Sequence, residues 1–373
     1  MEASLSPDFD LIVIGGGPAG ASTAITAARA GWRVLLLERG HVPRHKVCGE
    51  FVSAESLVLL HWLLGEAGHE LIEHSLPLTE SHLLLDGRCV RIPVNPPAAS
   101  ITRYDLDLAL WMEAQNAGVT VLQETTVQRI EGDAPFRVQT STGEFCARTL
   151  VNASGRWSNL SRAESHSNGS RWLGLKAHYH GETEPGVDLY FFKGGYCGVQ
   201  PVRSAEGTTL INVCALVRPG VAATLEDLFL CHPLLHCRSR GWTPAFAPLS
   251  TFPAIFRDPC PVAGRVFNAG DAAGFVDPFV GDGISLALRG GHLAAQNLSV
   301  FLNGQCELEQ ALKKYTQAYR SVLRPVYRVS SVLRRLLAIP RPLRAPFLSA
   351  CENSPRLARY LVEATRSRAL ELA

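Results

Sequence analysis

The order of apolar and polar positions near the start of the chain predicts a strand, a helix and a second strand. Phe9–Ile14 is a short continuous apolar run, which is typical of a buried strand. Pro18–Ala30 is rich in alanine and is followed by Gly31, which predicts a helix with a glycine stop. Arg33–Glu38 contains a second buried run, so the three segments predict a parallel βαβ unit.

The rest of the chain divides into strand-rich and helix-rich parts. Two apolar runs around Asp86–Gly87 predict a hairpin. Helices are expected at Arg103–Gly118 and Gly283–Leu302, and the C-terminal part is expected to be mainly helical, interrupted by prolines at 325, 340, 342, 346 and 355. Further strands are expected at Val119–Gln123, Val127–Ile130, Phe136–Thr140, Phe145–Val151, Leu173–Tyr179, Val187–Phe192, Thr208–Val217 and Val266–Asn268.

The first loop of the βαβ unit carries the pattern G-x-G-x-x-G. Gly15 permits the tight turn, Gly17 lets the backbone approach a pyrophosphate, and Gly20 lets the helix pack on the strand. The helix that begins at Pro18 and Ala19 offers its N-terminus to the phosphates. Glu38 ends the second strand, where it is placed to bond ribose hydroxyls, and Arg39 follows it. These residues predict a dinucleotide site.

A second glycine-rich segment, Gly270-Asp271-Ala-Ala-Gly-Phe-Val-Asp-Pro278-Phe-Val-Gly281-Asp-Gly283, follows the strand at 266–268. It resembles the second FAD motif of the aromatic-hydroxylase superfamily of flavoproteins, and most of all that of its geranylgeranyl reductase branch. The resemblance implies that Asp271 binds the ribityl and phosphate region and that Pro278 lies beside the flavin ring. It also implies that backbone amides at Gly281–Gly283 meet the pyrimidine edge, and Ile284 is expected to bind the cofactor as well. The positive end of the helix that begins near Gly283 favours the negative charge of reduced flavin.

The resemblance continues in two charged segments. Pro43-Arg44-His45-Lys46-Val47-Cys48-Gly49-Glu50 is similar to the P-R-x-x-x-C-G stretch of the geranylgeranyl reductases, which implies that Arg44 approaches the cofactor and Cys48 lies near the ring. Cys48 is then either a catalytic proton donor or a packing residue. Arg103 matches the arginine that contacts FAD phosphate. Asn152 to Ser158 occupies the place of the family's D-G motif but lacks its Asp, so direct use of NADPH is less certain.

A motif of the expected substrate domain is only partly present. Tyr196-Cys-Gly198-Val-Gln200-Pro201 resembles the Y-x-W-x-F-P motif of geranylgeranyl reductases, with Gly198 in place of Trp and Gln200 in place of Phe. Tyr196, Gln200 and Pro201 are therefore expected to contact the substrate, in a pocket of altered shape. Both tryptophans of the corresponding halogenase motif are missing and no lysine occurs between Lys46 and Lys176, which argues against halogenation.

The strand-rich blocks interrupt the dinucleotide-binding parts, which predicts an α/β fold with a Rossmann-like domain interwoven with a β-sheet domain. The resemblance implies that this architecture is similar to that of para-hydroxybenzoate hydroxylase. We expect a discontinuous FAD-binding domain at 1–78, 100–160 and 262–330, a substrate domain at 79–99 and 161–261, and a basic helical tail at 331–373.

Charge is uneven along the chain. From Arg320 onward there are eleven arginines, no lysine and three glutamates, a net charge of +8 in a chain whose total is +2. This basic tail either contacts an anionic membrane surface or packs its apolar face on the body of the protein. Neither nucleic acid nor a particular oligomeric state is indicated.

Composition bears on compartment and metals. The ten cysteines are scattered without a CxxC pair, and Met1–Asp10 contains three acids and no apolar run, so a cytoplasmic protein is expected. Cys231-His-Pro-Leu-Leu-His-Cys237 is expected to be a helix with half-exposed histidines rather than a metal site.

Two reactions fit these motifs. The first is FAD-dependent reduction of a C=C bond in, or dehydrogenation of, an apolar metabolite or prenyl-type lipid, with NAD(P)H as the expected electron donor. The second is flavin-dependent hydroxylation of an aromatic or polyketide-like compound.

Overall fold

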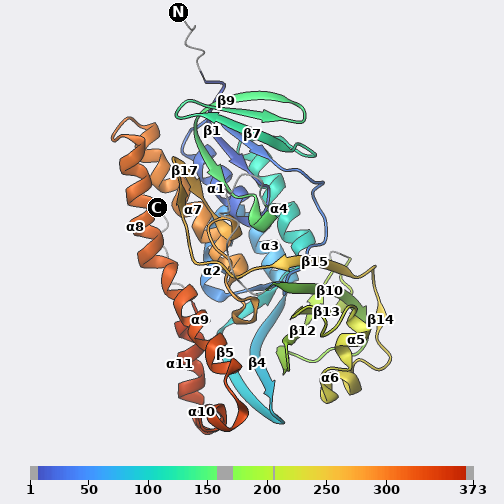
Figure 1. Cartoon of the computed structure of the whole chain (residues 1–373). Coiled ribbons are helices and arrows are strands. Elements are labelled where there is room, and N and C mark those ends of the chain that lie inside the picture. The colour runs from blue at the N-terminus through green and yellow to red at the C-terminus, as the bar shows by residue number, and fades with distance from the viewer. Residues whose placement is uncertain (1–6, 158–170, 205, 367–373) are drawn as a thin grey trace, which may run out of the picture.

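The computed structural model describes residues 7–157, 171–204 and 206–366 and contains two sheets (Figure 1). The first sheet has the order β16-β17-β9-β1-β2-β6, with β7 and β8 attached to β9. The second has the order β14-β10-β13-β12-β11-β4-β5-β3, with β15 attached to β10. The mixed α/β fold is the one expected from the sequence. The domain boundaries given above stay a prediction.

The first sheet is built around the buried strand β1 (Phe9–Ile14), which pairs in parallel with β2 and β9. Its side chains from Leu11 to Ile14 are buried, because helices and further strands cover both faces. The other strands of this sheet are β2 (Val34–Leu37), β6 (Thr120–Leu122), β7 (Val127–Gly132), β8 (Phe136–Thr140), β9 (Gly143–Asn152), β16 (Val262–Ala263) and β17 (Val266–Asn268).

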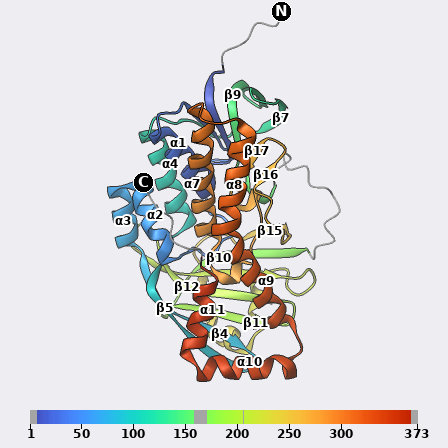
Figure 2. The same cartoon turned by 90° about the vertical axis from the view of Figure 1, so that its left-hand side faces the viewer.

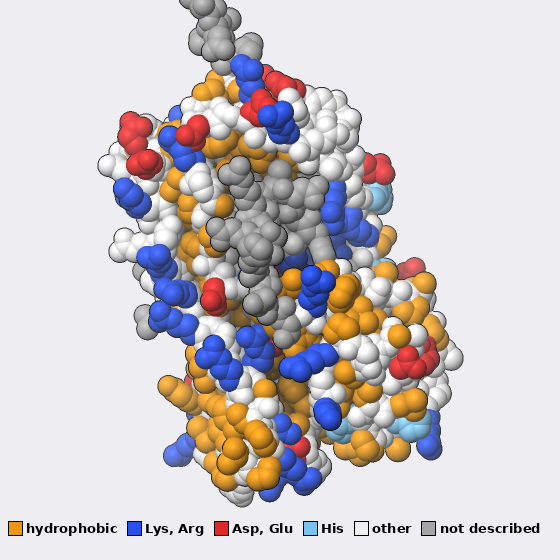
Figure 3. All heavy atoms as spheres, viewed as in Figure 1, with side chains coloured by type: hydrophobic (Ala, Val, Ile, Leu, Met, Phe, Trp, Pro, Cys, Tyr) orange, Lys and Arg blue, Asp and Glu red, His pale blue; other side chains and the backbone are white. Residues whose placement is uncertain are grey.

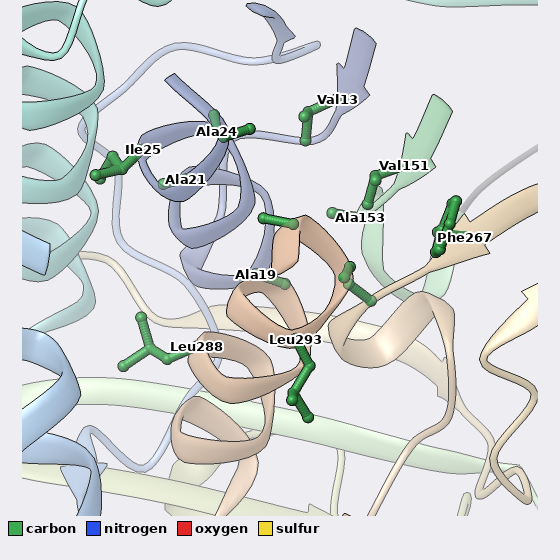
Figure 4. Packing of buried hydrophobic residues seen from close by; sticks show 14 of the residues in the cluster. Val13, Ala19, Ala21, Ala24, Ile25, Val151, Ala153, Phe267, Leu288 and Leu293 are labelled. Carbon is green, nitrogen blue, oxygen red and sulfur yellow. The ribbon is translucent and has the colours of Figure 1, made fainter. Parts of the chain in front are cut away.

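Helices α1 (Pro18–Arg29) and α7 (Gly283–Leu302) cross closely on this sheet (Figure 4). A Cβ atom added to Gly291 would lie 2.1 Å from the carbonyl oxygen of Ala19, so a larger residue cannot stand there. The hydroxyl of Ser22 donates to the carbonyl of Leu288 at 2.8 Å. This close crossing brings the two glycine-rich motifs together although they are some 250 residues apart in sequence.

The second sheet is antiparallel apart from the β4–β11 pair, which is parallel. Its long hairpin, β4 (Leu76–Leu85) and β5 (Arg88–Ser100), turns at Asp86–Gly87 as expected but extends further at both ends. The remaining strands are β3 (Phe51–Val52), β10 (Trp172–His180), β11 (Val187–Phe192), β12 (Gly195–Arg203), β13 (Thr209–Val217), β14 (Thr243–Pro244) and β15 (Leu249–Ala254).

The remaining helices surround the two sheets. They are α2 (Ala54–Leu64), α3 (Glu66–His74), α4 (Arg103–Asn116), α5 (Leu225–Phe229), α6 (Pro233–Arg238), α8 (Leu308–Val322), α9 (Arg324–Ala338), α10 (Arg341–Asn353) and α11 (Pro355–Ala364). Short 3₁₀ turns occur at Gly155–Trp157, Gly270–Ala272 and Pro278–Val280. In the part of the chain that is described, no helix is long and apolar enough to cross a bilayer.

The C-terminal helices α10 and α11 pack against β5 of the β4–β5 hairpin, and Leu337 of α9 joins the same apolar cluster (Figures 1 and 2). Leu348 and Cys351 of α10 are buried together with Leu85 and Val90 of the hairpin. Arg344 forms a two-pronged ion pair with Asp86, with both contacts at 2.7 Å, and Arg88 pairs with Glu352. The apolar face of the tail therefore packs on the protein.

The structure adds one strand that the sequence interpretation did not assign and differs from it at one proline. Gly195–Arg203 forms β12. Pro346 lies inside α10 and does not interrupt it, and Pro325, Pro342 and Pro355 stand at helix starts, where the missing N–H is tolerated. His232 is the N-cap of α6, and both His232 and His236 are half-buried, as expected.

Candidate active site

A cavity of about 640 Å³ lies between the two sheets and reaches the C-terminal helices. Most of the predicted site residues line it, namely Gly15, Gly17, Pro18, Ala19, Glu38, Arg39, Arg44, Cys48, Arg103, Tyr196, Gln200, Gly270, Asp271, Pro278, Gly281, Gly283 and Ile284. Gly20 and Pro201, which the structure also describes, do not line this cavity. The two motifs and the substrate segment thus share one space.

The first glycine motif has the geometry that a pyrophosphate site requires. Gly15 has a φ of +109°, and a Cβ there would lie 2.3 Å from the carbonyl oxygen of Ala153. A Cβ on Gly20 would lie 1.7 Å from the carbonyl oxygen of Gly15, so this glycine serves the packing of α1 on β1. At Gly17 the nearest side-chain atom would be Arg103 Nη2 at 3.8 Å, which leaves the backbone open to the cavity.

Glu38 is held at the end of β2 by the loops around it. Its carboxylate accepts hydrogen bonds from the amides of Gly16 at 2.8 Å and Gly40 at 3.0 Å, and it pairs with Arg44 at 3.0 Å. Burial opposes ionisation, but Lys46 and these amides hold the pKa of Glu38 below its usual value. An ionised carboxylate at this place suits two ribose hydroxyls.

Arg103 begins α4 and is fixed by Asp107. Its Nε and Nη2 atoms lie 2.9 and 2.8 Å from the two carboxylate oxygens of Asp107, which also accepts from Lys46 at 2.7 Å. This network directs two cationic side chains to the edge of the cavity beside Gly17. The arrangement fits the negative charge of a cofactor phosphate.

Asp271 faces the same part of the cavity, and its side chain is about 35% exposed. Burial raises its pKa, and Arg156, whose Nε lies 3.4 Å away, opposes that rise. Asn152 stands where the family's Asp is missing and still shapes the turn. It accepts from the amide of Ser154 at 3.2 Å and donates to Asn268 at 3.1 Å, and Gly155 has a φ of +78°.

The second motif ends at the N-terminus of α7. Gly281 has a φ of +70°, a Cβ on Gly283 would meet nothing within 4 Å, and both glycines line the cavity. A helix N-terminus carries partial positive charge, which favours an anion beside it. The residues present therefore fit FAD along the whole length of this wall, which we call the cofactor wall: the residues of the two glycine motifs with Glu38, Arg44, Arg103 and Asp271.

The loop that carries Cys48 is anchored by a buried ionic network that the sequence interpretation missed. Glu50 has a φ of +59°, and its carboxylate pairs with Lys176 and, at 2.7 Å, with Nε2 of His178. All three side chains are at most 2% exposed. Burial opposes ionisation, but the charges of Lys176 and His178 lower the pKa of Glu50 to about 2. The sequence signal that could have revealed this network is Lys176 and His178, two polar residues two positions apart in an otherwise apolar strand, where they share one face.

The substrate segment on β12 also contacts this loop. Gln200 donates to the carbonyl of Glu50 at 3.2 Å and to Ser100 Oγ at 2.7 Å, and Asn212 of β13 donates to the carbonyl of Gly49 at 2.8 Å. Gln200 therefore holds the Cys48 loop as well as lining the cavity. Pro201 is buried in β12 away from the cavity.

Tyr196 forms a buried pair with Asp277, the residue before Pro278. The tyrosine hydroxyl donates to Asp277 Oδ1 at 3.0 Å, and both residues are under 10% exposed. Burial raises the pKa of Asp277 to about 6 and that of Tyr196 well above its usual value. The rings of Phe191 and Phe279 pack around the tyrosine. Sequence reasoning named Tyr196 and missed its partner.

The far end of the cavity is apolar. We call it the apolar arm: residues Leu83, Val90, Ile92 and Val94 of the hairpin, with Leu333, Leu337, Phe347, Leu348 and Leu361 of the C-terminal helices. No sequence signal placed the tail here, because its register on the hairpin depends on contacts across some 250 residues.

The segment considered for a metal does not gather ligands. His232 packs against the ring of Tyr190 at 5.2 Å, while Cys237 is exposed. Among the residues that the structure describes, no group of three or more His, Cys, Asp or Glu side chains has a metal-binding arrangement.

Comparison with protein families supports the two motifs. Residues 9–169 match a family described as pyridine nucleotide-disulphide oxidoreductase, and residues 262–330 match one described as FAD binding domain. Conditioned medium factor receptor 1 of Dictyostelium discoideum is 27% identical over 82% of this chain and 66% of its own length. Menaquinone reductase of Mycobacterium tuberculosis strain H37Rv is 27% identical over 79% of this chain and 78% of its own.

Solved structures share the whole fold. A geranylgeranyl bacteriochlorophyll reductase-like protein from Thermoplasma acidophilum superposes with a TM-score of 0.76 at 18% identity, covering 95% of each chain. The flavin-dependent brominase Bmp2 also gives 0.76, at 20% identity over 96% of this chain and 93% of its own. The sequence matches and the paired motifs together show that the chain is an FAD-dependent oxidoreductase of the superfamily that contains the aromatic hydroxylases.

Proposed function

We propose that the chain reduces a C=C bond of, or dehydrogenates, an apolar small metabolite or prenyl-type lipid. The observation that carries the proposal is the continuity of one cavity from the cofactor wall to the apolar arm. The relatives named menaquinone reductase and geranylgeranyl reductase-like support the same class of substrate. An apolar chain in the arm gains free energy by leaving water, at about 25 cal/mol per Å² buried.

The site residues have separate roles in this proposal. Bound FAD supplies hydride chemistry at the flavin ring. The cofactor wall would hold it through Gly17, Glu38, Arg103 and Asp271, and Pro278 would lie beside the ring. NAD(P)H is proposed as the electron donor, and bleaching of the flavin by NADH or NADPH under anaerobic conditions tests this.

The proton that accompanies the hydride needs an acid at the cavity wall. We assign it to the Tyr196–Asp277 pair. The tyrosine hydroxyl donates to Asp277 when the carboxylate is ionised. When Asp277 is protonated, which its pKa of about 6 allows near neutral pH, the carboxylic acid donates to the tyrosine oxygen instead; the tyrosine hydroxyl can then pass its proton to the substrate carbon next to the one that receives hydride, and Asp277 replaces that proton. Cys48 is the alternative donor, since it also lines the cavity.

Hydroxylation of an aromatic or polyketide-like compound is the second candidate function. The observation that favours it is the aromatic cluster around Tyr196, in which Phe256 stacks on Phe275 at 5.6 Å and Phe191 and Phe279 cover the tyrosine. A dry wall of this kind protects an oxygen adduct from water.

One experiment separates the two functions. The purified holoprotein is reduced anaerobically and mixed with aerated buffer in a stopped-flow spectrometer. Direct return of oxidised flavin, without an intermediate and with release of free peroxide, is the result expected for the reductase. A transient flavin peroxide absorbance would contradict the reductase and support the hydroxylase.

We also propose that this cytoplasmic enzyme touches anionic membranes through its tail. Arg335, Arg341, Arg356 and Arg359 are exposed, and Leu343 is 69% exposed beside them. Figure 3 shows apolar side chains gathered on the C-terminal helices with basic side chains around them. Each basic residue near an anionic surface contributes about 1 kcal/mol.

Sedimentation with liposomes of phosphatidylserine and phosphatidylcholine tests this contact. Binding that weakens with salt and is lost in a variant with Arg341, Arg356 and Arg359 changed to Glu is expected. Equal sedimentation of the variant, or none of the wild type at low salt, would contradict it. The packed apolar face of the tail limits the contact to these side chains.

A further inference from the structure

The C-terminal segment contacts the FAD-binding loop through one side chain. Arg366 follows α11, and its Nη1 donates to the carbonyl of Val280 at 3.0 Å and lies 3.5 Å from Oδ1 of Asp282. Its guanidinium also covers the ring of Phe51 at 5.1 Å. Arg366, Gly281 and Gly283 all line the cavity, so the C-terminal segment meets the end of the second glycine motif there.

Asp282 is a buried carboxylate at the start of α7 that does not cap the helix with its side chain. Its side chain is 1% exposed, it stands at the N-cap of α7, and its Oδ2 has no hydrogen-bond partner among the described residues. Ser53 donates to Oδ1 at a long 3.4 Å. Burial raises the pKa of Asp282 to about 6, and the charges of Arg366 and Arg289 oppose that rise.

The sign of the local charge matters for a flavin. A reduced flavin carries negative charge that the oxidised form lacks, and the N-terminus of α7 favours such charge. An ionised Asp282 at the same N-terminus opposes it. Arg366 offsets the carboxylate with a cation that reaches the loop from the far end of the chain.

We propose that Arg366 is a positioning residue through which the docked C-terminal segment neutralises Asp282 and raises the reduction potential of the bound FAD. The proposal requires FAD in the cavity, which the two motifs support, and it is independent of which substrate is reduced. Failure of the C=C reductase assignment would leave it intact.

A reciprocal effect follows from linkage. If docking of the segment favours reduced flavin by some factor, reduction of the flavin strengthens docking by the same factor. The C-terminal helices form one side of the apolar arm, so reduction would hold that arm closed while the reduced enzyme carries its substrate.

The test is the midpoint potential of the flavin in the holoprotein, measured at pH 8 by equilibration with a reference dye. Arg366→Ala is expected to favour oxidised over reduced flavin by about tenfold, which is about 30 mV lower for a two-electron couple. Arg366→Lys should keep most of the wild-type potential. Arg359→Ala is the matched control, because Arg359 is exposed and its recorded partner, Glu363, lies on its own helix.

Asp282 completes a double-mutant cycle. Asp282→Asn should raise the potential, and Asp282→Asn combined with Arg366→Ala should return it to near the wild-type value, because the two charges are removed together. If Arg366→Ala fails to retain FAD, Asp282→Asn and Arg366→Lys still decide the matter. A potential unchanged in Asp282→Asn, or equal in Arg366→Ala and Arg359→Ala, would overturn the proposal.

Limited trypsin digestion gives an independent readout of docking. The tail of the wild-type holoprotein should be cleaved more slowly when the flavin is reduced anaerobically than when it is oxidised, and Arg366→Ala should lose that difference. Equal cleavage of the two redox states in the wild type would contradict the linkage.

Discussion

The two ends of the cavity differ in the kinds of groups that line them. The cofactor wall consists of backbone held by glycines and of charged side chains fixed by partners, as at Gly15, Gly20 and Glu38. The apolar arm consists of aliphatic and aromatic side chains from two elements, the β4–β5 hairpin and the C-terminal helices, joined by the Arg344–Asp86 ion pair.

This difference determines how each end responds to change. At Gly15 and Gly20 an added methyl group meets backbone, which cannot move aside, so the shape of the first glycine loop is fixed. In the apolar arm, side chains repack around a ligand and tolerate volume changes with smaller losses. The first glycine loop can therefore stay constant while the side chains of the apolar arm vary. Changes at each end should therefore affect one ligand and spare the other.

The largest expected effect is at Gly17. Gly17→Val places a branched side chain where the backbone is open to the cavity, so the purified protein should contain almost no FAD. Absorbance of the flavin relative to protein measures this. Ala30→Val, at an exposed position at the end of α1, is the control for expression and folding. Normal FAD content in Gly17→Val would contradict the assigned phosphate site.

The next effect concerns the loop between the two ends. Lys176→Met leaves the buried Glu50 carboxylate with His178 alone, and breaking a buried pair in this way costs about 3–5 kcal/mol of unfolding free energy. Urea unfolding at pH 7 measures it, and Lys314→Met, at an exposed position on α8, is the matched control. A loss no larger than in the control would show that the network does not stabilise the fold.

The same pair has a pH signature. The pKa of Glu50 is lowered to about 2 in the folded state, so its contribution is present above the usual carboxyl pKa and is lost as pH falls toward 2. Lys176→Met should move this loss of stability to higher pH, which acid titration of the unfolding midpoint would detect.

A smaller effect is expected in the substrate segment. Tyr196, Gly198 and Gln200 alternate along β12 toward the cavity. Gly198→Trp should reduce space for an apolar ligand and weaken binding of the probe anilinonaphthalene sulfonate about tenfold, or 1.4 kcal/mol, with FAD content unchanged. Leu230→Trp, at an exposed position, serves as control. Loss of FAD in Gly198→Trp would mean that the two ends are not separable.

The smallest effect is expected at Cys48. Cys48→Ser keeps the size of the side chain and should leave FAD content nearly normal while slowing reoxidation of the reduced flavin by an apolar acceptor substrate. Cys89→Ser, at an exposed cysteine, is the control. An unchanged rate would show that Cys48 only packs beside the cofactor.

The parts that the sequence predicted are those set by local rules. The first glycine motif, the strand before it and Glu38 at the end of β2 lie within 30 residues. Each can be recognised from local sequence without knowing the rest of the fold. The second motif could be joined to the first because its residue types match a known pattern.

Other parts depend on contacts between distant segments. Glu50 meets Lys176 across 126 residues, and Asp277 meets Tyr196 across 81. β12 is a strand because β11 and β13 pair with it on both sides, which overrides its glycines. Pro346 is accommodated within α10, and the tail meets the hairpin through Arg344 and Asp86, a pairing that periodicity alone does not reveal.

The most direct measurement of the central claim is a titration of the flavin-free protein with FAD. The wild type should bind FAD non-covalently and saturably, Asp271→Ala should bind it at least about tenfold more weakly because an acceptor held by the fold is lost, and Val90→Ala in the apolar arm should bind it as the wild type does. Equal affinity of the wild type and Asp271→Ala, or a loss in Val90→Ala as large as in Asp271→Ala, would contradict the division of the cavity into a cofactor wall and an apolar arm.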